Sequence, residues 1–399
     1  MILVCEPFWT GTQHAPGNSA TIQTIARAFP GQQVRVSAEA THLRELQADT
    51  ALTAHPNASL SAIAVSPVFP SKPQIVSARR ALTEFGALRA ALRAAPPGEP
   101  VLLMLLSATP TAIFAASWLA RSARRRIGVQ IGLHGNLNEM QGWRPRNPLA
   151  RMFDLRSALG ARHGGKVRFL VLENAIRTAL AELLPSAAAV TDVLPLPINL
   201  TELAVVRDVA FDPPLRIGLV GQATEAKGIT AFLALAREFG ASHADKVAFH
   251  VVGRAVPGDD MTRFAPLAEV PPTSQFPREE FLQRLARLHY VCLPLQPGYY
   301  NLSASGALID AVTWLKPVIA TPVPIMRDMF QQFGDIGYLC RDMDEMRSIV
   351  ATLLNAPDAA RYARQVEAIR KARDSRMPDA LAADYRRIVD RGFTRLLTP

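Results

Sequence analysis

The chain has 399 residues, of which 49% are hydrophobic, and a formal net charge of +10 at pH 7. This length suits two domains of about 150–200 residues, and no apolar run reaches the roughly 18 residues that would span a bilayer. The N-terminus has neither the basic region nor the cleavage site of a signal peptide. The three cysteines are odd in number and widely spaced, which predicts free, buried thiols in a reducing compartment and hence a cytoplasmic protein.

The first half of the chain alternates strand and helix patterns. Its strands are short, continuous apolar runs, which are typical of a parallel sheet covered by helices on both faces. Strands are predicted at residues 2–5, 34–37, 61–65, 101–106, 127–133, 167–172 and 190–194, and helices at 21–29, 76–94 and 110–122.

A proline-rich, irregular stretch at 195–214 separates this half from a second strand–helix series. We therefore predict an α/β protein with two doubly wound, Rossmann-like domains at 1–200 and 201–378, followed by a basic C-terminal helix at 379–399. Two such domains facing each other would enclose a central cleft. The second series has predicted strands at 215–220, 247–252, 291–294 and 318–320, and predicted helices at 228–239, 278–288 and 305–314.

The segment 302–321 carries the most informative functional pattern. Ser303, Ser305 and Gly306 open a predicted helix, and Asp310 follows about one turn later. Free backbone N–H groups at such a helix start attract an anion. A carboxylate one turn further in would repel phosphate but accept hydrogen bonds from hydroxyl groups. Together these residues predict a binding site for a nucleotide diphosphate and its ribose.

This segment resembles the nucleotide-sugar motif of retaining GT-B glycosyltransferases, the group that includes bacterial mannosyl- and glucosyltransferases. In that family a Glu, seven residues and a second Glu-Ala precede a Gly-Lys-Pro-Val-Ile-Ala strand. Asp310 stands at the second Glu, which contacts the ribose in the family, and Leu302 stands at the first, which contacts the transferred sugar. The resemblance implies the GT-B fold and a last helix that packs on the N-terminal domain. It supports nucleotide binding more directly than sugar choice or stereochemistry.

The segment 219–228 also resembles the family. Lys227 matches a lysine that, with an arginine, clamps the diphosphate in the family, and Gln222 replaces that arginine after Gly221. Arg254, which follows a later strand, is the predicted substitute cation. The alternative for Lys227 is an ordinary exposed lysine at a helix start.

The N-terminal half contributes predicted residues of its own. His134 follows an apolar strand between two glycines, and the family often has a histidine there, near the transferred sugar. A lone histidine is more often structural, so that alternative stays open. The resemblance implies that the loop 8–19 lines the acceptor side, with His14, Gly17 and Asn18, and we predict that Asn136 joins them. The alternative is an ordinary surface loop.

Two further charge patterns bear on partners and cofactors. Basic residues cluster at 124–126 and between 144 and 168, which is consistent with attachment to anionic lipid or with a solvated helix face. No nucleic-acid motif accompanies them, so we predict no nucleic-acid partner. The pair Asp342 and Asp344 is interpreted as a helix N-terminus rather than a metal motif, so we expect no metal and no cofactor.

The resemblance implies a glycosyltransferase that moves a sugar from a nucleotide diphosphate to a saccharide or lipid-linked acceptor, as in the synthesis of bacterial surface polysaccharides or glycoconjugates. Retention of configuration is implied by the resemblance alone. Lys227 and His134 are the predicted catalytic residues, with Lys227 facing the charge that develops on the leaving diphosphate. The protein would be cytoplasmic, or peripheral on the inner membrane face. The alternatives are a nucleotide-sugar epimerase or hydrolase on the same fold, and a non-catalytic partner subunit that binds a sugar nucleotide.

Overall fold

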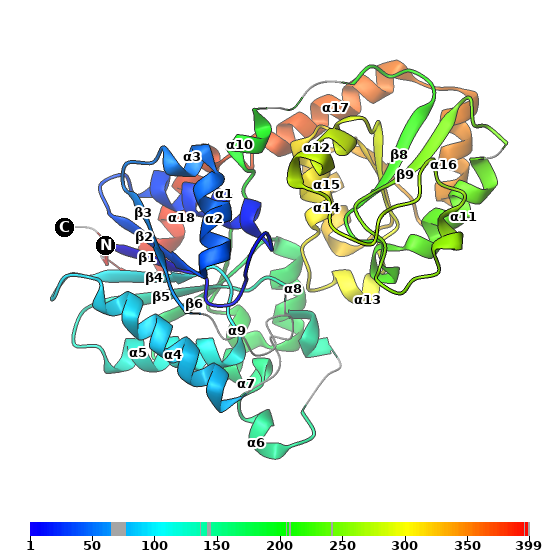
Figure 1. Cartoon of the computed structure of the whole chain (residues 1–399). Coiled ribbons are helices and arrows are strands. Elements are labelled where there is room, and N and C mark those ends of the chain that lie inside the picture. Colours follow the sequence, from blue (N-terminus) through cyan, green and yellow to red (C-terminus); the bar gives the residue numbers. More distant parts are fainter. Residues whose placement is uncertain are drawn as a thin grey trace. The chain divides into compact units, whose positions relative to one another are not determined.

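A computed structural model describes residues 1–64, 77–135, 137–141, 145–204, 206, 209–240, 242–394 and 396–397. The chain forms two compact units, drawn in Figure 1. Unit 1 comprises Met1–Thr201 with Arg376–Pro399, and unit 2 comprises Glu202–Ser375. Within the described residues, no helix is both long enough and apolar enough to cross a membrane.

Unit 1 is built on a seven-stranded sheet whose strands are all parallel and lie in the order β3-β2-β1-β4-β5-β6-β7. The strand order reverses between β1 and β4, and ligands of such sheets bind beyond the carboxyl ends of the strands at this point. The central strands are fully buried, as their continuous apolar runs predicted. The strands are β1 (Ile2–Cys5), β2 (Val34–Ala38), β3 (Ala58–Ala62), β4 (Val101–Leu105), β5 (Ile127–Gly132), β6 (Val167–Val171) and β7 (Thr191–Val193).

Helices pack on this sheet, and the first of them begins earlier than predicted. Helix α1 starts at Ala15 because Pro16 is tolerated in a first helical turn, where its missing N–H is not needed. Gly17 and Asn18 therefore lie in a helix rather than in a loop. The other helices of the first 199 residues are α2 (Ala40–Ala48), α3 (Thr50–Thr53), α4 (Ala78–Arg93), α5 (Pro110–Ser122), α6 (Pro148–Arg151), α7 (Leu155–Gly160), α8 (Asn174–Leu183) and α9 (Pro185–Ala188), and α1 spans Ala15–Ala28.

The end of the chain belongs to unit 1. Helix α18 (Pro378–Gly392) lies against α1, as Figure 1 shows. Tyr385 is fully buried in the same apolar cluster as Ile22 and Ile25. At the return of the chain, the guanidinium of Arg376 donates to both carboxylate oxygens of Glu173 at 2.9 and 3.0 Å, and both side chains are buried. Burial of apolar side chains and the ion pair between Arg376 and Glu173 thus hold α18 on unit 1.

Unit 2 is a second parallel sheet, with five strands in the order β12-β11-β10-β8-β9. Three of its strands end at the predicted residues, and Cys292 and Cys340 are free and buried, as is Cys5 in unit 1. The prediction of two Rossmann-like α/β domains is confirmed. The strands are β8 (Leu215–Val220), β9 (Val247–Val252), β10 (Tyr290–Leu293), β11 (Val318–Ala320) and β12 (Gly337–Leu339), and the helices are α11 (Ile229–Phe239), α12 (Arg278–Ala286), α13 (Pro297–Tyr300), α14 (Gly306–Thr313), α15 (Pro324–Phe333), α16 (Met343–Asn355) and α17 (Ala359–Asp374), with α10 (Leu200–Leu203) at the junction.

Candidate functional site

Three loops interlock at the carboxyl edge of the unit 2 sheet. The loop after β8 bonds to the loop after β9, because Gly221 N donates to Val252 O and Ala223 N donates to Arg254 O, both at 2.8 Å. Gly228 has a φ of +76°, and a Cβ added there would lie 2.0 Å from Pro294 O in the loop after β10. Glycine is therefore required at 228 both by its backbone conformation and by this close approach.

Lys227 is curled back onto the end of β8. Its Nζ donates to Val220 O at 2.8 Å, and a Cβ on Gly221 would lie only 2.2 Å from the same nitrogen. An ammonium has three N–H donors, and this carbonyl takes one of them. Lys227 as a whole residue is partly exposed. Desolvation of its ammonium nevertheless lowers the pKa of Lys227 to about 8, and the negative charge of Asp310 acts in the opposite direction. The side chain is therefore a positioned cation rather than a solvated helix-end lysine.

A pocket of about 230 Å³ opens beside this lysine, beyond the ends of β8 and β9. Three of its lining residues, Gly221, Gln222 and Arg254, are predicted donor-binding residues. The remainder are Gly253, Gln275, Phe276, Arg278 and Phe281. In the described part of the chain, no hydrogen bond or ion pair ties the side chain of Arg254. The pocket thus combines aromatic faces, amide groups and two arginines.

Arg278, the first residue of α12, connects this pocket to Asp310. Its guanidinium donates to both oxygens of Glu202 at 2.7 and 2.8 Å and to Asp310 Oδ1 at 3.3 Å. The same guanidinium lies 4.7 Å from the ring centroid of Phe281. Burial opposes its charge, but Asp310 and Glu202 outweigh that cost and raise the pKa of Arg278 above its ordinary value. Asp310 is therefore held in place by a cation that sequence analysis did not single out.

The serines before α14 lie at the start of that helix, as predicted, and one of them caps it. Ser305 is buried and caps α14, since its Oγ accepts from Leu308 N at 3.3 Å. Ser303 is also buried, whereas Gly306, the first helical residue, is exposed. Leu302, which stands at the family's first Glu position, is buried in the apolar interior. The Ser305 side chain thus stabilises the start of α14.

Ser305→Ala is expected to lower the free energy of unfolding by about 1 kcal/mol, the usual cost of losing an N-cap. Nucleotide affinity should change less than twofold, because the hydroxyl serves the helix and not a ligand. Thermal unfolding and calorimetry on the same sample separate the two effects. Ser303→Ala is the matched control, since Ser303 caps no helix. A large loss of affinity with unchanged stability would instead assign the Ser305 hydroxyl to the ligand.

His134 lies beyond the carboxyl end of β5 in unit 1, in a cluster of three rings. The His14 ring lies 4.9 Å from the His134 ring and 4.4 Å from the Trp9 ring, measured between centroids. Burial, followed by repulsion from His14, lowers the pKa of His134 to about 3, so its imidazole is neutral at pH 7. His14 has a φ of +58°, a left-handed conformation that costs a non-glycine residue about 1–2 kcal/mol. Strain of this kind concentrates at functional sites.

Glu6, which directly follows β1, organises the loop that carries these rings. Its Oε1 accepts from Phe8 N at 2.9 Å and from Trp9 N at 3.0 Å, and its Oε2 accepts from Asn18 Nδ2 at 3.3 Å. Burial raises the pKa of Glu6, and hydrogen bonds from the Ser107 hydroxyl and from the backbone of Trp9 and Phe8 oppose that shift. Asn18 is buried and its amide also contacts His42 Nε2 at 3.1 Å, so it braces the loop. Gly17 lies in α1, where an added Cβ would lie 3.4 Å from Leu196 Cδ1. Asn136 lies outside the described residues.

Comparison with known proteins gives matches in structure but not in sequence. No protein-family model matches the chain, and no curated protein matches it. A glycosyltransferase from Rickettsia africae has a TM-score of 0.66 at 12% identity, covering 98% of each chain. Anabaena Alr3699/HepE, solved with UDP-glucose, has a TM-score of 0.62 at 13% identity, covering 97% of this chain and 98% of that one. WaaG, a glycosyltransferase involved in lipopolysaccharide biosynthesis, has a TM-score of 0.61 at 12% identity, and the match covers 98% of this chain and 99% of that one.

The chain has the GT-B fold. Sequence analysis missed two residues, namely Glu6, which directly follows β1, and Arg278, which opens α12 and lines the pocket beyond β8 and β9. Glu6 had a detectable signal, because a charged residue directly after a buried strand lies at the edge where ligands bind. Arg278 had a weaker sequence signal, because its only distinguishing feature is that it opens a predicted helix shortly after Phe276.

The acidic pair at the start of α16 is structural. Asp342 Oδ1 accepts from Glu345 N at 2.8 Å, which is the N-cap interaction predicted for it. Among the described residues, no group of three or more His, Cys, Asp or Glu side chains is arranged to hold a metal ion.

Proposed function

We propose that this GT-B protein is a glycosyltransferase that uses a nucleotide-diphosphate sugar as donor. The observation that carries the proposal is the convergence of Lys227, Asp310 and Arg278 beside one pocket at the carboxyl ends of β8 and β9. A cation, a carboxylate and an aromatic pocket match the three parts of such a donor, which are the diphosphate, the ribose and the base.

Each part has a physical role. Phe276 and Phe281 offer ring faces for a base, and the amides of Gln222 and Gln275 offer both donors and acceptors for its edge. Asp310 accepts hydrogen bonds from ribose hydroxyls. The Lys227 ammonium faces the diphosphate, where negative charge grows as the glycosidic bond breaks, and stabilising that charge accelerates the step. Gln222 stands where the family has a second cation, an arginine. Arg254, which lines the same pocket, supplies that cation instead.

Uridine nucleotides are the first donors to test. Two structures of Anabaena Alr3699/HepE contain UDP-glucose and UDP, and we extend that donor class to this chain. Thermal shift with nucleoside diphosphates and nucleotide sugars should select one base, and the selected donor is then incubated with and without acceptor. Donor turnover without acceptor would favour a hydrolase or epimerase. Binding without any turnover would favour a non-catalytic partner subunit.

The acceptor side belongs to unit 1 in this proposal. The neutral His134 imidazole and the strained His14 lie beside Trp9, whose flat ring suits a sugar face. We also propose retention of configuration, which the family resemblance alone implies, and NMR of the product's anomeric signal tests it. Loss of transfer in His134→Ala with unchanged donor affinity would place this histidine with the acceptor or transferred sugar.

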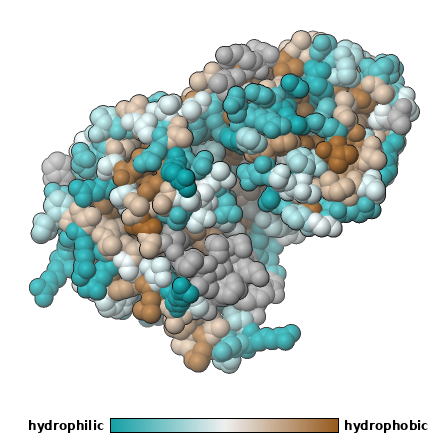
Figure 2. Space-filling model, viewed as in Figure 1, coloured by the Kyte–Doolittle hydropathy of each residue, from teal (hydrophilic) through white to brown (hydrophobic). Residues whose placement is uncertain are grey.

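A lipid-linked acceptor is favoured by an exposed apolar turn in unit 1. Leu149 and Met152 are 69% and 62% exposed, and Phe153 is 44% exposed, around helix α6. Arg146 and Arg151 are exposed on the same turn. Figure 2 shows hydrophobic atoms beside hydrophilic ones at the lower tip of the view, where Figure 1 places α6. Apolar side chains flanked by arginines suit an anionic lipid surface.

Leu149→Ser with Met152→Ser is expected to weaken binding to anionic vesicles about tenfold, because two side chains no longer enter the lipid interface. Binding of the parent protein should also fall with salt, since the Debye length shrinks from about 10 Å at 0.1 M to about 3 Å at 1 M. Cosedimentation with vesicles of varied anionic content measures both effects. Val270→Ser, which alters a 54% exposed valine in unit 2, is the control. Equal binding to neutral and anionic vesicles, or none to either, would favour a soluble acceptor.

A further inference from the structure

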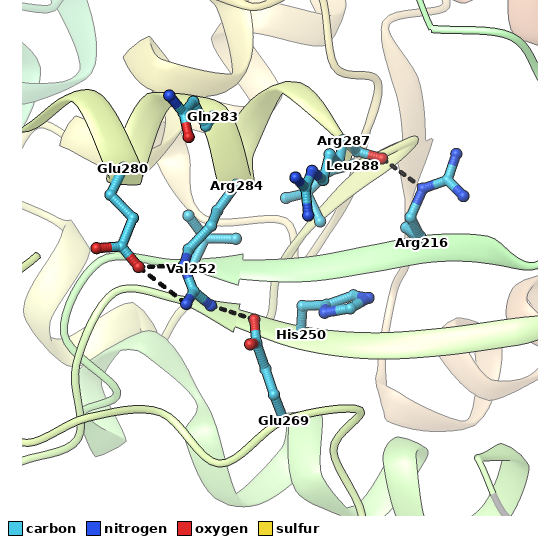
Figure 3. A pocket seen from close by; sticks show the side chains of 9 residues that line it. All are labelled: Arg216, His250, Val252, Glu269, Glu280, Gln283, Arg284, Arg287 and Leu288. Atoms are coloured by element: carbon cyan, nitrogen blue, oxygen red, sulfur yellow. Dashed lines mark hydrogen bonds and ion pairs between the residues drawn. The ribbon is translucent and has the colours of Figure 1, made fainter.

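A second pocket in unit 2 lies between α12 and the edge of the sheet, as Figure 3 shows. Its volume is about 310 Å³, and β9, which contributes His250, is the last strand of the sheet. It shares no lining residue with the donor pocket, which lies beyond the strand ends and takes only Arg278 and Phe281 from α12. The two are therefore separate cavities on one helix.

The arginines that line this pocket are unevenly paired. Arg284 is neutralised by Glu280, 3.0 Å away, and by an ion pair with Glu269 (Figure 3). Arg216 donates from Nε to the backbone oxygen of Arg287 at 2.6 Å. The guanidinium of Arg287 itself has no hydrogen bond or ion pair within the part of the chain that the structure describes. Arg216 also pairs with Asp212, 3.6 Å away and outside the pocket lining. Of the three lining guanidiniums, the exposed Arg287 is thus the one that no carboxylate pairs among the described residues.

His250 adds an unsatisfied polar atom to the same wall. Its Nε2 is buried and has no hydrogen-bond partner among the described residues. Burial lowers the pKa of His250, and Arg216, Arg284 and Arg287 lower it further, while Glu269 acts the other way. Buried polar atoms are normally paired, so an unpaired one beside a free cation indicates a missing partner. An oxyanion would be a partner for both.

We propose that this pocket binds the phosphate group of a small molecule, with Arg287 and His250 as its principal contacts. Guanidinium is well matched to phosphate oxygens in charge and geometry. The volume lies at the lower end of the range for small-molecule sites, about 300–1,000 Å³, and so exceeds the needs of a bare ion. Gln283 and Glu280 line the same pocket and offer polar groups that could hydrogen-bond the hydroxyl groups of a phosphate ester.

The test follows the ring signals of His250 by NMR, assigned with His250→Asn, during titration with inorganic phosphate and with glucose 6-phosphate. We expect saturable shifts at concentrations below about 10 mM, the range of weak metabolite binding. Tighter binding of the ester would identify a phosphorylated metabolite as the ligand, whereas equal binding would identify the free ion. Arg287→Ala should weaken binding of both probes at least tenfold.

Two controls make the assignment specific. Arg364→Ala removes an exposed arginine of α17 that has no side-chain partner among the described residues, and it should leave the titration unchanged. Lys227→Ala should also leave the His250 titration unchanged. This control distinguishes binding in this pocket from phosphate binding in the donor pocket, and it makes the test independent of whether the proposed transferase activity is correct. Absence of saturable shifts with both probes, or identical titrations in the parent and Arg287→Ala, would overturn the proposal.

Discussion

Lys227→Ala is expected to lower the turnover number for glycosyl transfer by about 100- to 1,000-fold, the usual effect of removing one positioned donor from a developing negative charge. The geometry supports an effect of this size. Val220 O holds the ammonium at 2.8 Å, and glycine at 221 leaves it the space it occupies. The cation is thus in place before the donor arrives, so no reorganisation is needed during the reaction. Steady-state and single-turnover assays with the selected donor measure the change.

Lys246→Ala is the matched control, because Lys246 is an exposed lysine of the same unit. It should leave turnover within about twofold, since surface substitutions away from a site have small effects. If Lys227→Ala behaves like this control, Lys227 is an ordinary surface lysine and another cation carries the diphosphate.

The lowered pKa of Lys227 adds a test that depends on pH. Its pKa of about 8 means that the free protein loses the ammonium proton as the pH rises through that value. A diphosphate binds the charged form, so binding must then take up a proton and nucleotide affinity should fall between about pH 7.5 and 9.5, where phosphate groups are fully ionised. The slope should be absent in Lys227→Ala. Calorimetry in buffers of different ionisation enthalpy reports the proton directly.

The fold was predictable because its strands are continuous apolar runs with sharp ends. Strands 215–220, 247–252 and 318–320 match β8, β9 and β11 to the residue. The errors have local causes. Pro16 and Gly17 resemble breakers, yet both fit a first helical turn. Strand β3 lies at 58–62 rather than 61–65, because this edge strand of small and polar residues carries little apolar signal.

The candidate site was less predictable because it depends on contacts between distant segments. The sequence places Gly221, Gln222 and Arg254 after the ends of predicted parallel strands. Because such ends lie at one edge of the sheet, the sequence predicts that these residues lie close together. Arg278 lies 32 residues from Asp310 and 76 from Glu202, and no spacing rule links them. Their contact exists only once α12 and α14 have packed on the sheet.

Asp310→Ala is expected to weaken binding of the selected nucleoside diphosphate by about 1.5–3 kcal/mol, the range for hydrogen bonds to a charged group. The variant should also bind a 2′,3′-dideoxy analogue as tightly as the ribonucleotide, because the group that accepts from the ribose hydroxyls is gone. Calorimetry with both nucleotides measures the affinity and the discrimination. Unchanged discrimination would remove Asp310 from the ribose site.

Arg278→Ala is expected to reduce that discrimination as well, although Arg278 itself need not touch the ribose. Its guanidinium joins Asp310 at 3.3 Å to Glu202 at 2.7 Å, so its removal frees the Asp310 carboxylate to turn into solvent. Residues that act through one another are not additive, and coupling of about 0.5–3 kcal/mol is usual for neighbours in one network. The double variant should therefore lose less affinity than the two single losses added together.

Arg347→Ala is the control for this cycle, because Arg347 also pairs with two carboxylates of unit 2, Glu238 and Asp344, but does not line the donor pocket. It should preserve both affinity and ribose discrimination. Strict additivity of Arg278→Ala and Asp310→Ala would mean that Arg278 contacts the nucleotide independently, as a pocket arginine. Coupling would instead show that the Asp310 carboxylate binds ribose only while Arg278 orients it. The nucleotide site would then depend on α12, which carries Arg278, and not only on the motif of α14.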